Sequence, residues 1–213
     1  MKDFVYRLQI KMHGRCIHDL MKYIVIAQAT VFFLDLCFTS YNFISYLTLD
    51  FSMVLKGQVW RLITFLFVPP ETSIIFILFA LYFYYIIGTS LANEWGDFTF
   101  DFYYLLGTIG CIIASAITGY SSNIYLNMSL FFAFAVLYPD FRVLLFFFIP
   151  IKVKWLAVID AAFYIISLIL GPGSVRVQIL FSLLNFFLFF WKDMYLSIKQ
   201  AIYVQKNRRR WKQ

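Results

Sequence analysis

The sequence predicts an all-α membrane protein built from six membrane-spanning helices. Hydrophobic residues make up 62% of the 213 positions, aromatic residues 22% and charged residues only 14%, whereas a soluble domain carries about 25% charged residues. Several apolar runs are long enough to cross a bilayer as helices, and short polar segments separate them. The polar and apolar alternation of a membrane β-barrel is not seen.

Composition also limits the chemistry that can be expected. Three scattered cysteines, Cys16, Cys37 and Cys111, do not form a disulfide framework or a metal-binding pattern. We therefore expect no metal and no cofactor. The net charge is +7, but the basic residues cluster outside the apolar runs, which favours anionic lipid over nucleic acid as the partner.

The N-terminal part of the chain predicts a surface segment, one span and an embedded loop. Residues 1–22 mix basic and apolar positions and predict a cytoplasmic amphipathic helix. The first span is expected at residues 23–39. The loop at residues 40–60 is too apolar to be solvated and too short to span twice, so we expect it to lie partly within one leaflet.

The loop ends at Trp60-Arg61, beside further apolar sequence. An unpaired guanidinium in that setting is costly. Two interpretations stay open: a snorkelling arginine with an interfacial tryptophan, or an anchor for a structured loop.

The second and third spans are expected at residues 72–91 and 102–118. Pro69-Pro70 ends any helix that begins before the second span. A short polar loop containing Glu94-Trp95-Gly96, Asp97 and Asp101 should separate the two spans. In the third, small residues recur every four positions, which predicts a close helix-packing face: Gly107, Cys111, Ser115 and Gly119.

Three more spans complete the predicted membrane domain, residues 23–192. They are expected at residues 124–138, which is short, and at 155–170 and 177–191. Residues 141–152 predict an interfacial or re-entrant connection, and Gly171 to Ser174 a tight turn. Residues 193–213 form a basic tail expected to lie in the cytoplasm and to meet anionic lipid or protein.

Polar residues inside these spans are candidates for functional or interhelical contacts: Asp35, Asn127, Ser129, Asp160 and Asn185. For the two acids, capping or pairing with Arg61, Lys154 or Arg176 is weighed against a role in transport.

The distribution of Lys and Arg predicts the topology. With six spans, 15 of these residues fall on the side of both termini and 3 on the other side. The positive-inside rule then places both termini in the cytoplasm, in what we expect to be a bacterial plasma membrane.

Several motifs, in order, resemble the rhomboid superfamily. They are Gly57-x-x-Trp60-Arg61-Leu62-Ile63-Thr64 in the first loop, Gly88 and Leu91-x-x-Glu94-Trp95-Gly96 at the second helix, Ala133-x-x-Val136-Leu137-Tyr138-Pro139-Asp140 after the fourth, and Ile149-Pro150-Ile151-Lys152 before the fifth. The resemblance covers roughly residues 20–192. It implies a six-helix rhomboid-like bundle with an embedded first loop.

The catalytic motifs of the family are absent. An active rhomboid has Gly-x-Ser-Gly at the start of the fourth helix and a histidine in the sixth. Here the fourth span begins Ser121-Ser122-Asn123-Ile124, and residues 177–191 contain no histidine. A serine without a base is a poor nucleophile, so no catalytic residue is predicted.

The resemblance therefore implies a pseudoprotease, similar in logic to the Derlins. Such a protein binds transmembrane clients and perturbs the bilayer without cleaving, as in protein quality control. A rhomboid protease with a rearranged site and a small transporter or lipid-interacting protein remain alternatives.

Overall fold

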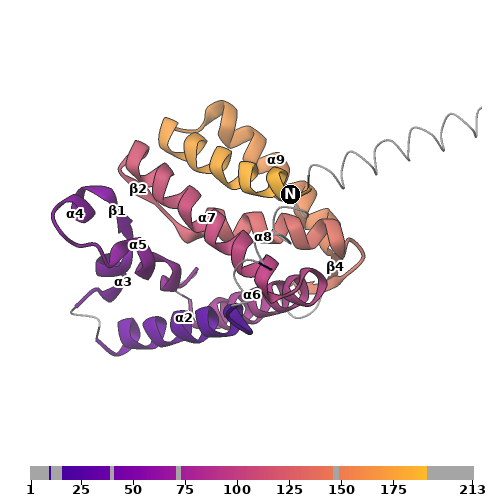
Figure 1. Ribbon diagram of the computed structural model, residues 1–213. Helices are drawn as coiled ribbons and strands as arrows, with labels where there is room; N and C mark the ends of the chain where they lie inside the picture. Colours follow the sequence, from indigo (N-terminus) through magenta and orange to yellow (C-terminus); the bar gives the residue numbers. More distant parts are fainter. Residues whose placement is uncertain (1–9, 11–15, 39–40, 71–72, 146–148, 191–213) are drawn as a thin grey trace, which may run out of the picture.

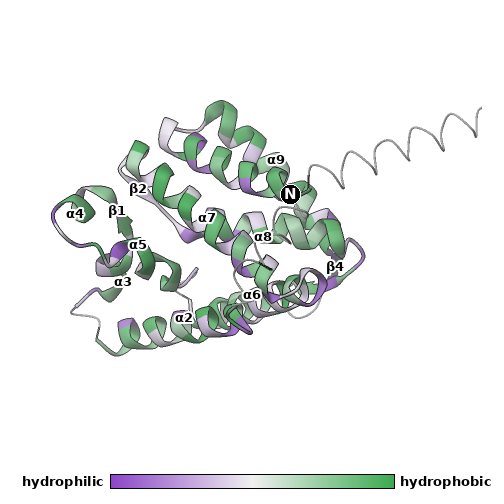
Figure 2. Cartoon of the chain, viewed as in Figure 1, coloured by the Kyte–Doolittle hydropathy of each residue, from purple (hydrophilic) through white to green (hydrophobic). Residues whose placement is uncertain are grey.

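The computed structural model describes residue 10 and residues 16–38, 41–70, 73–145 and 149–190. Apolar helices, five of them long, lie at the six places where the sequence predicts a span (Figures 1 and 2). They are α2 (Leu20–Cys37), α6 (Ile74–Trp95), α7 (Asp97–Thr118), α8 (Asn123–Leu137), α9 (Val153–Leu170) and the helix Gly173–Phe190.

Five of these six helices, within the described residues, are long and apolar enough to cross a membrane. The exception is α8, whose 15 residues correspond to about 22 Å at ~1.5 Å per residue. The described residues form no closed sheet. The chain is thus a helical membrane protein.

The boundary between the second and third helices differs from the prediction. A polar loop was expected at Glu94, Asp97 and Asp101, but α6 continues through Trp95 and α7 begins at Asp97. Only Gly96 separates the helices, with φ +84°, a conformation that glycine adopts without a Cβ penalty. The prediction failed because these polar residues were assumed to interrupt the helices, whereas they occupy exposed or half-buried helical positions.

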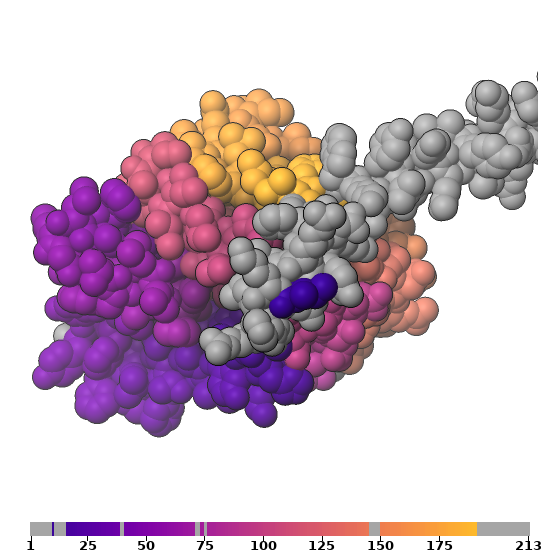
Figure 3. Space-filling view, viewed as in Figure 1, coloured from indigo at the N-terminus to yellow at the C-terminus, as the bar shows by residue number. Residues whose placement is uncertain are grey.

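The first loop is compact and structured. It contains α3 (Phe43–Leu47), β1 (Leu49–Asp50), α4 (Phe51–Leu55), α5 (Arg61–Thr64) and the 3₁₀ turn η1 (Phe65–Phe67). Strand β1 pairs with β2 (Tyr120–Ser121), at the turn between α7 and α8. The loop elements and β2 gather at one end of the bundle (Figure 1), and the loop forms a purple surface beside the pink α7–α8 region in Figure 3.

The connection after α8 is a β-hairpin. Antiparallel strands β3 (Arg142–Leu145) and β4 (Ile149–Lys152) form the segment expected as an interfacial or re-entrant connection, and the strands themselves were not predicted. The β-branched residues Val143 and Ile151 favour strands. The strands were not predicted because residues 143–151 are all hydrophobic and show no alternation of polar and apolar positions. The hairpin lies at the opposite end of the bundle from the first loop (Figure 1).

The turn between α9 and the last helix is shorter than predicted. Gly171 and Pro172 alone separate the two helices, because Gly173 already begins the last one. Most of the predicted N-terminal segment, and all of the tail at residues 193–213, lie outside the described residues.

Aromatic and aliphatic side chains from α6, α7 and α8 fill the core of the bundle. The largest fully buried ones include Phe65, Phe100, Tyr103 and Phe134. Helix α9 contributes little, since Val153 is its one buried residue.

Candidate functional site

The predicted loop anchor Arg61 is buried, with 6% of its surface exposed. Its guanidinium donates to the Ser45 and Thr48 carbonyl oxygens at 2.8 and 2.7 Å, and to Gln58 Oε1 at 2.7 Å. These oxygens belong to the first loop, so two backbone carbonyl groups and one side-chain amide of the loop satisfy the buried charge. Trp60 remains half-exposed, at 49%, as an interfacial tryptophan would.

Two further amides hold the loop from outside. Gln28 on α2 is fully buried and donates to the Leu66 carbonyl oxygen at 2.9 Å. Asn123, at the start of α8, donates to the Val68 and Leu66 carbonyl oxygens at 2.8 and 3.3 Å. The Leu66 and Val68 carbonyl groups at the end of η1 thereby gain side-chain partners, as buried backbone groups require.

Within the loop, Asp50 caps α4 through the backbone N–H groups of Ser52 and Met53. The Ser52 hydroxyl, followed by these N–H groups, holds the pKa of the Asp50 carboxyl below its usual range. The Phe51 N–H donates to the Gly119 carbonyl oxygen at 2.8 Å. Loop, α2, α7 and α8 are therefore joined by hydrogen bonds as well as by packing.

Glu94-Trp95-Gly96 lies at the end of the bundle opposite the first loop, where it connects several helices. The Trp95 ring lies 5.4 Å from Tyr103 and 5.6 Å from Phe190, centroid to centroid. The Tyr138 hydroxyl donates to Glu94 Oε2 at 3.3 Å. Trp95 thus packs α6 against α7 and the last helix, and Glu94 meets the residue that follows α8.

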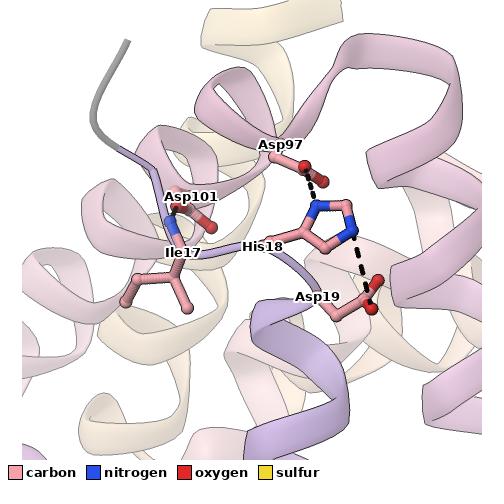
Figure 4. A network of polar contacts seen from close by, with 5 residues as sticks. All are labelled: Ile17, His18, Asp19, Asp97 and Asp101. Carbon is pink, nitrogen blue, oxygen red and sulfur yellow. Dashed lines mark hydrogen bonds and ion pairs between the residues drawn. The ribbon is translucent and has the colours of Figure 1, made fainter. Parts of the chain in front are cut away.

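The N-terminal approach to α2 contacts this same end of α7 (Figure 4). His18 Nδ1 lies 2.6 Å from an Asp97 carboxylate oxygen, and the Ile17 N–H donates to Asp101 at 2.6 Å. The contact with Asp97 raises the pKa of the exposed His18 imidazole.

The small residues of α7 lie where helices approach closely. Gly107, Cys111 and Ser115 are buried, whereas Gly119 is exposed and ends the helix with φ +88°. A Cβ on Gly107 would lie 2.2 Å from Leu126 Cδ1 and 2.8 Å from Asn185 Nδ2. A side chain at this position would therefore require Leu126 and Asn185 to move.

A polar cluster occupies the centre of the bundle beside Gly107. The Tyr103 hydroxyl lies 2.5 Å from Ser129 Oγ. Asn185 Nδ2 donates to Ser129 Oγ and to the Tyr103 carbonyl oxygen, at 3.3 and 3.4 Å. Three helices, α7, α8 and the last one, each contribute one residue, all of them 3% exposed or less.

A small cavity continues from this cluster toward the α7–α8 turn. Its volume is about 10 Å³, close to the lower limit for one water molecule. Its polar lining includes Ser121, Ser129, Gln178, Ser182 and Asn185. Ser182 is satisfied by the Tyr125 carbonyl oxygen at 2.6 Å, and Gln178 Nε2 by that of Tyr120 at 3.2 Å.

This arrangement lacks a base for serine activation among the described residues. The partners of Ser129 are an amide and a phenol, and an ordinary phenol loses its proton only near pH 10. His18 lies at the start of α7, whereas Ser121 and Ser122 follow its end, about 33 Å away along a 22-residue helix. No described group of three His, Cys, Asp or Glu residues could hold a metal.

The remaining predicted polar residues lie apart from this cluster or at its edge. Asn127 is buried beside the Tyr84 hydroxyl. Asp35 lies 3.5 Å from the Ile44 N–H, near the start of α3, which is the position of a weak cap. Asp160 is half-buried about two turns into α9. The acids occupy different helices and different depths.

The sequence pattern did not single out Gln28, Tyr103, Asn123, Gln178 or Ser182. A polar side chain within an apolar run was a usable signal for Gln28 and Gln178, because such a group needs a buried partner. Tyr103 gave no signal, since the chain contains 15 tyrosines and only the fold places its hydroxyl beside Ser129.

No family model matches the chain, and no curated protein matches it significantly.

Proposed function

We propose that this chain is a rhomboid-like pseudoprotease, which binds transmembrane client helices and perturbs the bilayer around them without cleaving them. The observation that carries the proposal is the Tyr103–Ser129–Asn185 cluster. It joins α8 to the last helix by hydrogen bonds beside a cavity of about 10 Å³. These two helices correspond in order to the ones that supply the serine and the histidine in an active rhomboid.

Two features support client binding. Helix α9 is the least buried of the five long helices, so it can be displaced at low cost in lost packing. Helix α8, at about 22 Å, is shorter than the ~30 Å hydrocarbon core of a bilayer. A short helix favours local thinning, which lowers the barrier for a client with polar residues in its span.

The alternatives are less well supported. The polar cavity is too small for a solute, which disfavours transport through it. Cleavage of a client can be measured directly, so the experiment below also tests for proteolysis.

The test uses the full chain in phosphatidylethanolamine–phosphatidylglycerol vesicles with a single-span model client that carries a fluorophore at each end. A photo-crosslinking residue replaces Phe163 on α9 or, as a matched control, Phe33 on α2. Both positions are similarly exposed, at 61% and 62%.

We expect crosslinks from position 163 that exceed those from position 33 and are stronger for a client with a polar residue in its span. No separation of the two fluorophores is expected. Equal crosslinking from the two positions would contradict client binding. Client cleavage that is lost in Ser129→Ala or Ser122→Ala would instead identify a protease.

A further inference from the structure

A groove lies on the side of the bundle formed by α8, α9 and the last helix. Its volume is about 400 Å³, and it is open at the surface. Aromatic and aliphatic side chains line it, among them Phe132, Val136, Ala161, Leu168 and Phe187. Lys154, in the first turn of α9, is the one charged side chain among the described residues that line it.

The volume of the groove can be compared with that of the membrane components that could occupy it. One turn of a helix, treated as a cylinder ~10 Å wide and ~5.4 Å long, takes up about 420 Å³. The groove would therefore enclose about a single turn of a client helix. An acyl chain is narrower than a helix, and it can follow the groove along α9. Burial of each methylene group contributes about 0.8 kcal/mol.

Positive charge gathers at the Lys154 end. Lys152 and Lys154 share a single carboxylate, Asp140, at 2.8 and 3.2 Å. Arg142 lies directly opposite Lys152 in the hairpin register. Like charges facing each other across a strand pair are unfavourable, and one carboxylate does not neutralise three cations. Among the described residues, Asp140 is the one carboxylate that pairs with these lysines, so a further anion would complement this end.

We propose that the groove binds one acyl chain of an anionic phospholipid, with its phosphate held at Lys154. The hairpin cations lie on the side where the distribution of Lys and Arg predicts the cytoplasm, and this leaflet carries the anionic lipid. The inference does not depend on client binding: it holds for the fold whether or not the chain has transmembrane clients.

The test is native mass spectrometry of the full chain in a non-ionic detergent. The protein is titrated with an equal mixture of phosphatidylglycerol and phosphatidylcholine that carry the same acyl chains. We expect one retained lipid per chain and at least a fivefold preference for phosphatidylglycerol. Lys154→Gln should bring the ratio of the two retained lipids close to one.

Filling the groove should remove the lipid. Ala161→Trp and, as a second variant, Ala157→Phe place a large side chain in its lining, and each should reduce retention at least fivefold. Val158→Trp adds the same bulk at a 60% exposed position of α9 and should retain lipid like the unmodified chain. The thermal midpoint of each variant shows that it is folded.

Three results would overturn the proposal. Retention could survive both filling variants, or the headgroup preference could survive Lys154→Gln. A single-span peptide or a second copy of the chain could also displace phosphatidylglycerol and be blocked by Ala161→Trp, which would assign the groove to a helix.

Discussion

The first loop and helix α9 contrast in how they satisfy their backbone. The loop at residues 41–70 is irregular, so its carbonyl groups need partners from Arg61, Gln28 and Asn123. Helix α9 pairs its own backbone and buries only one residue, Val153. Both segments are hydrophobic, but the first loop is held in place by buried hydrogen bonds, whereas α9 is attached mainly by the packing of one face.

This difference bears on function. Moving the loop would expose several buried polar groups at once, whereas moving α9 costs mainly the packing of its inner face. Client entry and lipid binding are both placed beside α9 for this reason, and the loop is expected to stay in place.

The sharpest comparison removes a phenylalanine ring from each region. Phe65 in η1 is 1% exposed and Phe163 on α9 is 61% exposed. Phe65→Ala should lower the free energy of unfolding by about 4 kcal/mol through cavity formation, and Phe163→Ala by less than about 0.5 kcal/mol. Unfolding titrations in mixed micelles measure both, and equal losses would remove the contrast between the regions.

The next effect tests whether polar contacts fix the loop. Arg61→Leu removes three charge-assisted hydrogen bonds and leaves buried carbonyl groups unpaired, which should cost about 3 kcal/mol. Lys56→Ala removes a cation from an exposed position of the same loop and should change stability by less than about 0.5 kcal/mol. The loop-anchor role fails if the two variants unfold at the same denaturant concentration.

A smaller loss is expected where α7 approaches its neighbours. Gly107→Ala forces a methyl group to within 2.2 Å of Leu126 and should cost about 2 kcal/mol through repacking. At Gly110 the nearest atom to an added Cβ is 3.7 Å away, an ordinary contact, so Gly110→Ala serves as the control. Similar thermal midpoints for the two variants would show that α8 and the last helix yield easily here.

Much of the architecture follows from the sequence, because hydrophobic length fixes where helices can cross a membrane. The positions of the six predicted helices agree with the structure to within five residues at each end. The largest difference is at α7, which begins five residues before its expected start, and α6 ends four residues after its expected end. The strands were missed. Two-residue β1 and β2 pair across about 70 residues of sequence, and only the packing of the loop against the α7–α8 turn brings them together.

The candidate site was predicted in part. Ser129 and Asn185 stood out as polar residues in apolar runs, and the structure brings them together. Asp35 and Asp160 stood out by the same reasoning, yet they lie apart from the cluster and from each other. A polar residue within a span indicates that a partner is needed, but the sequence does not show which residue the partner is. Tyr103 completes the cluster through tertiary packing alone.

The smallest effect concerns the N-terminal contact at His18. Its partner Asp97 raises the pKa of the imidazole in the folded chain above its ordinary value, near 6.5. The contact therefore stabilises most fully below that ordinary value, and its contribution is lost as the pH rises through the raised folded pKa. Hydrogen exchange of the backbone at residues 16–22 should accordingly speed up, beyond its intrinsic pH dependence, between mildly acidic and alkaline buffer.

Asp97→Asn separates this contact from general pH effects. The variant should return the His18 titration, followed by NMR in a His13→Gln background that leaves one histidine signal, toward its ordinary value. It should also abolish the additional pH dependence of exchange. Because His18 is 83% exposed, water and salt screen the contact, so high salt should weaken the same signal. A His18 titration unaffected by Asp97→Asn would mean that the N-terminal approach to α2 is held by Asp101 and the Ile17 backbone alone.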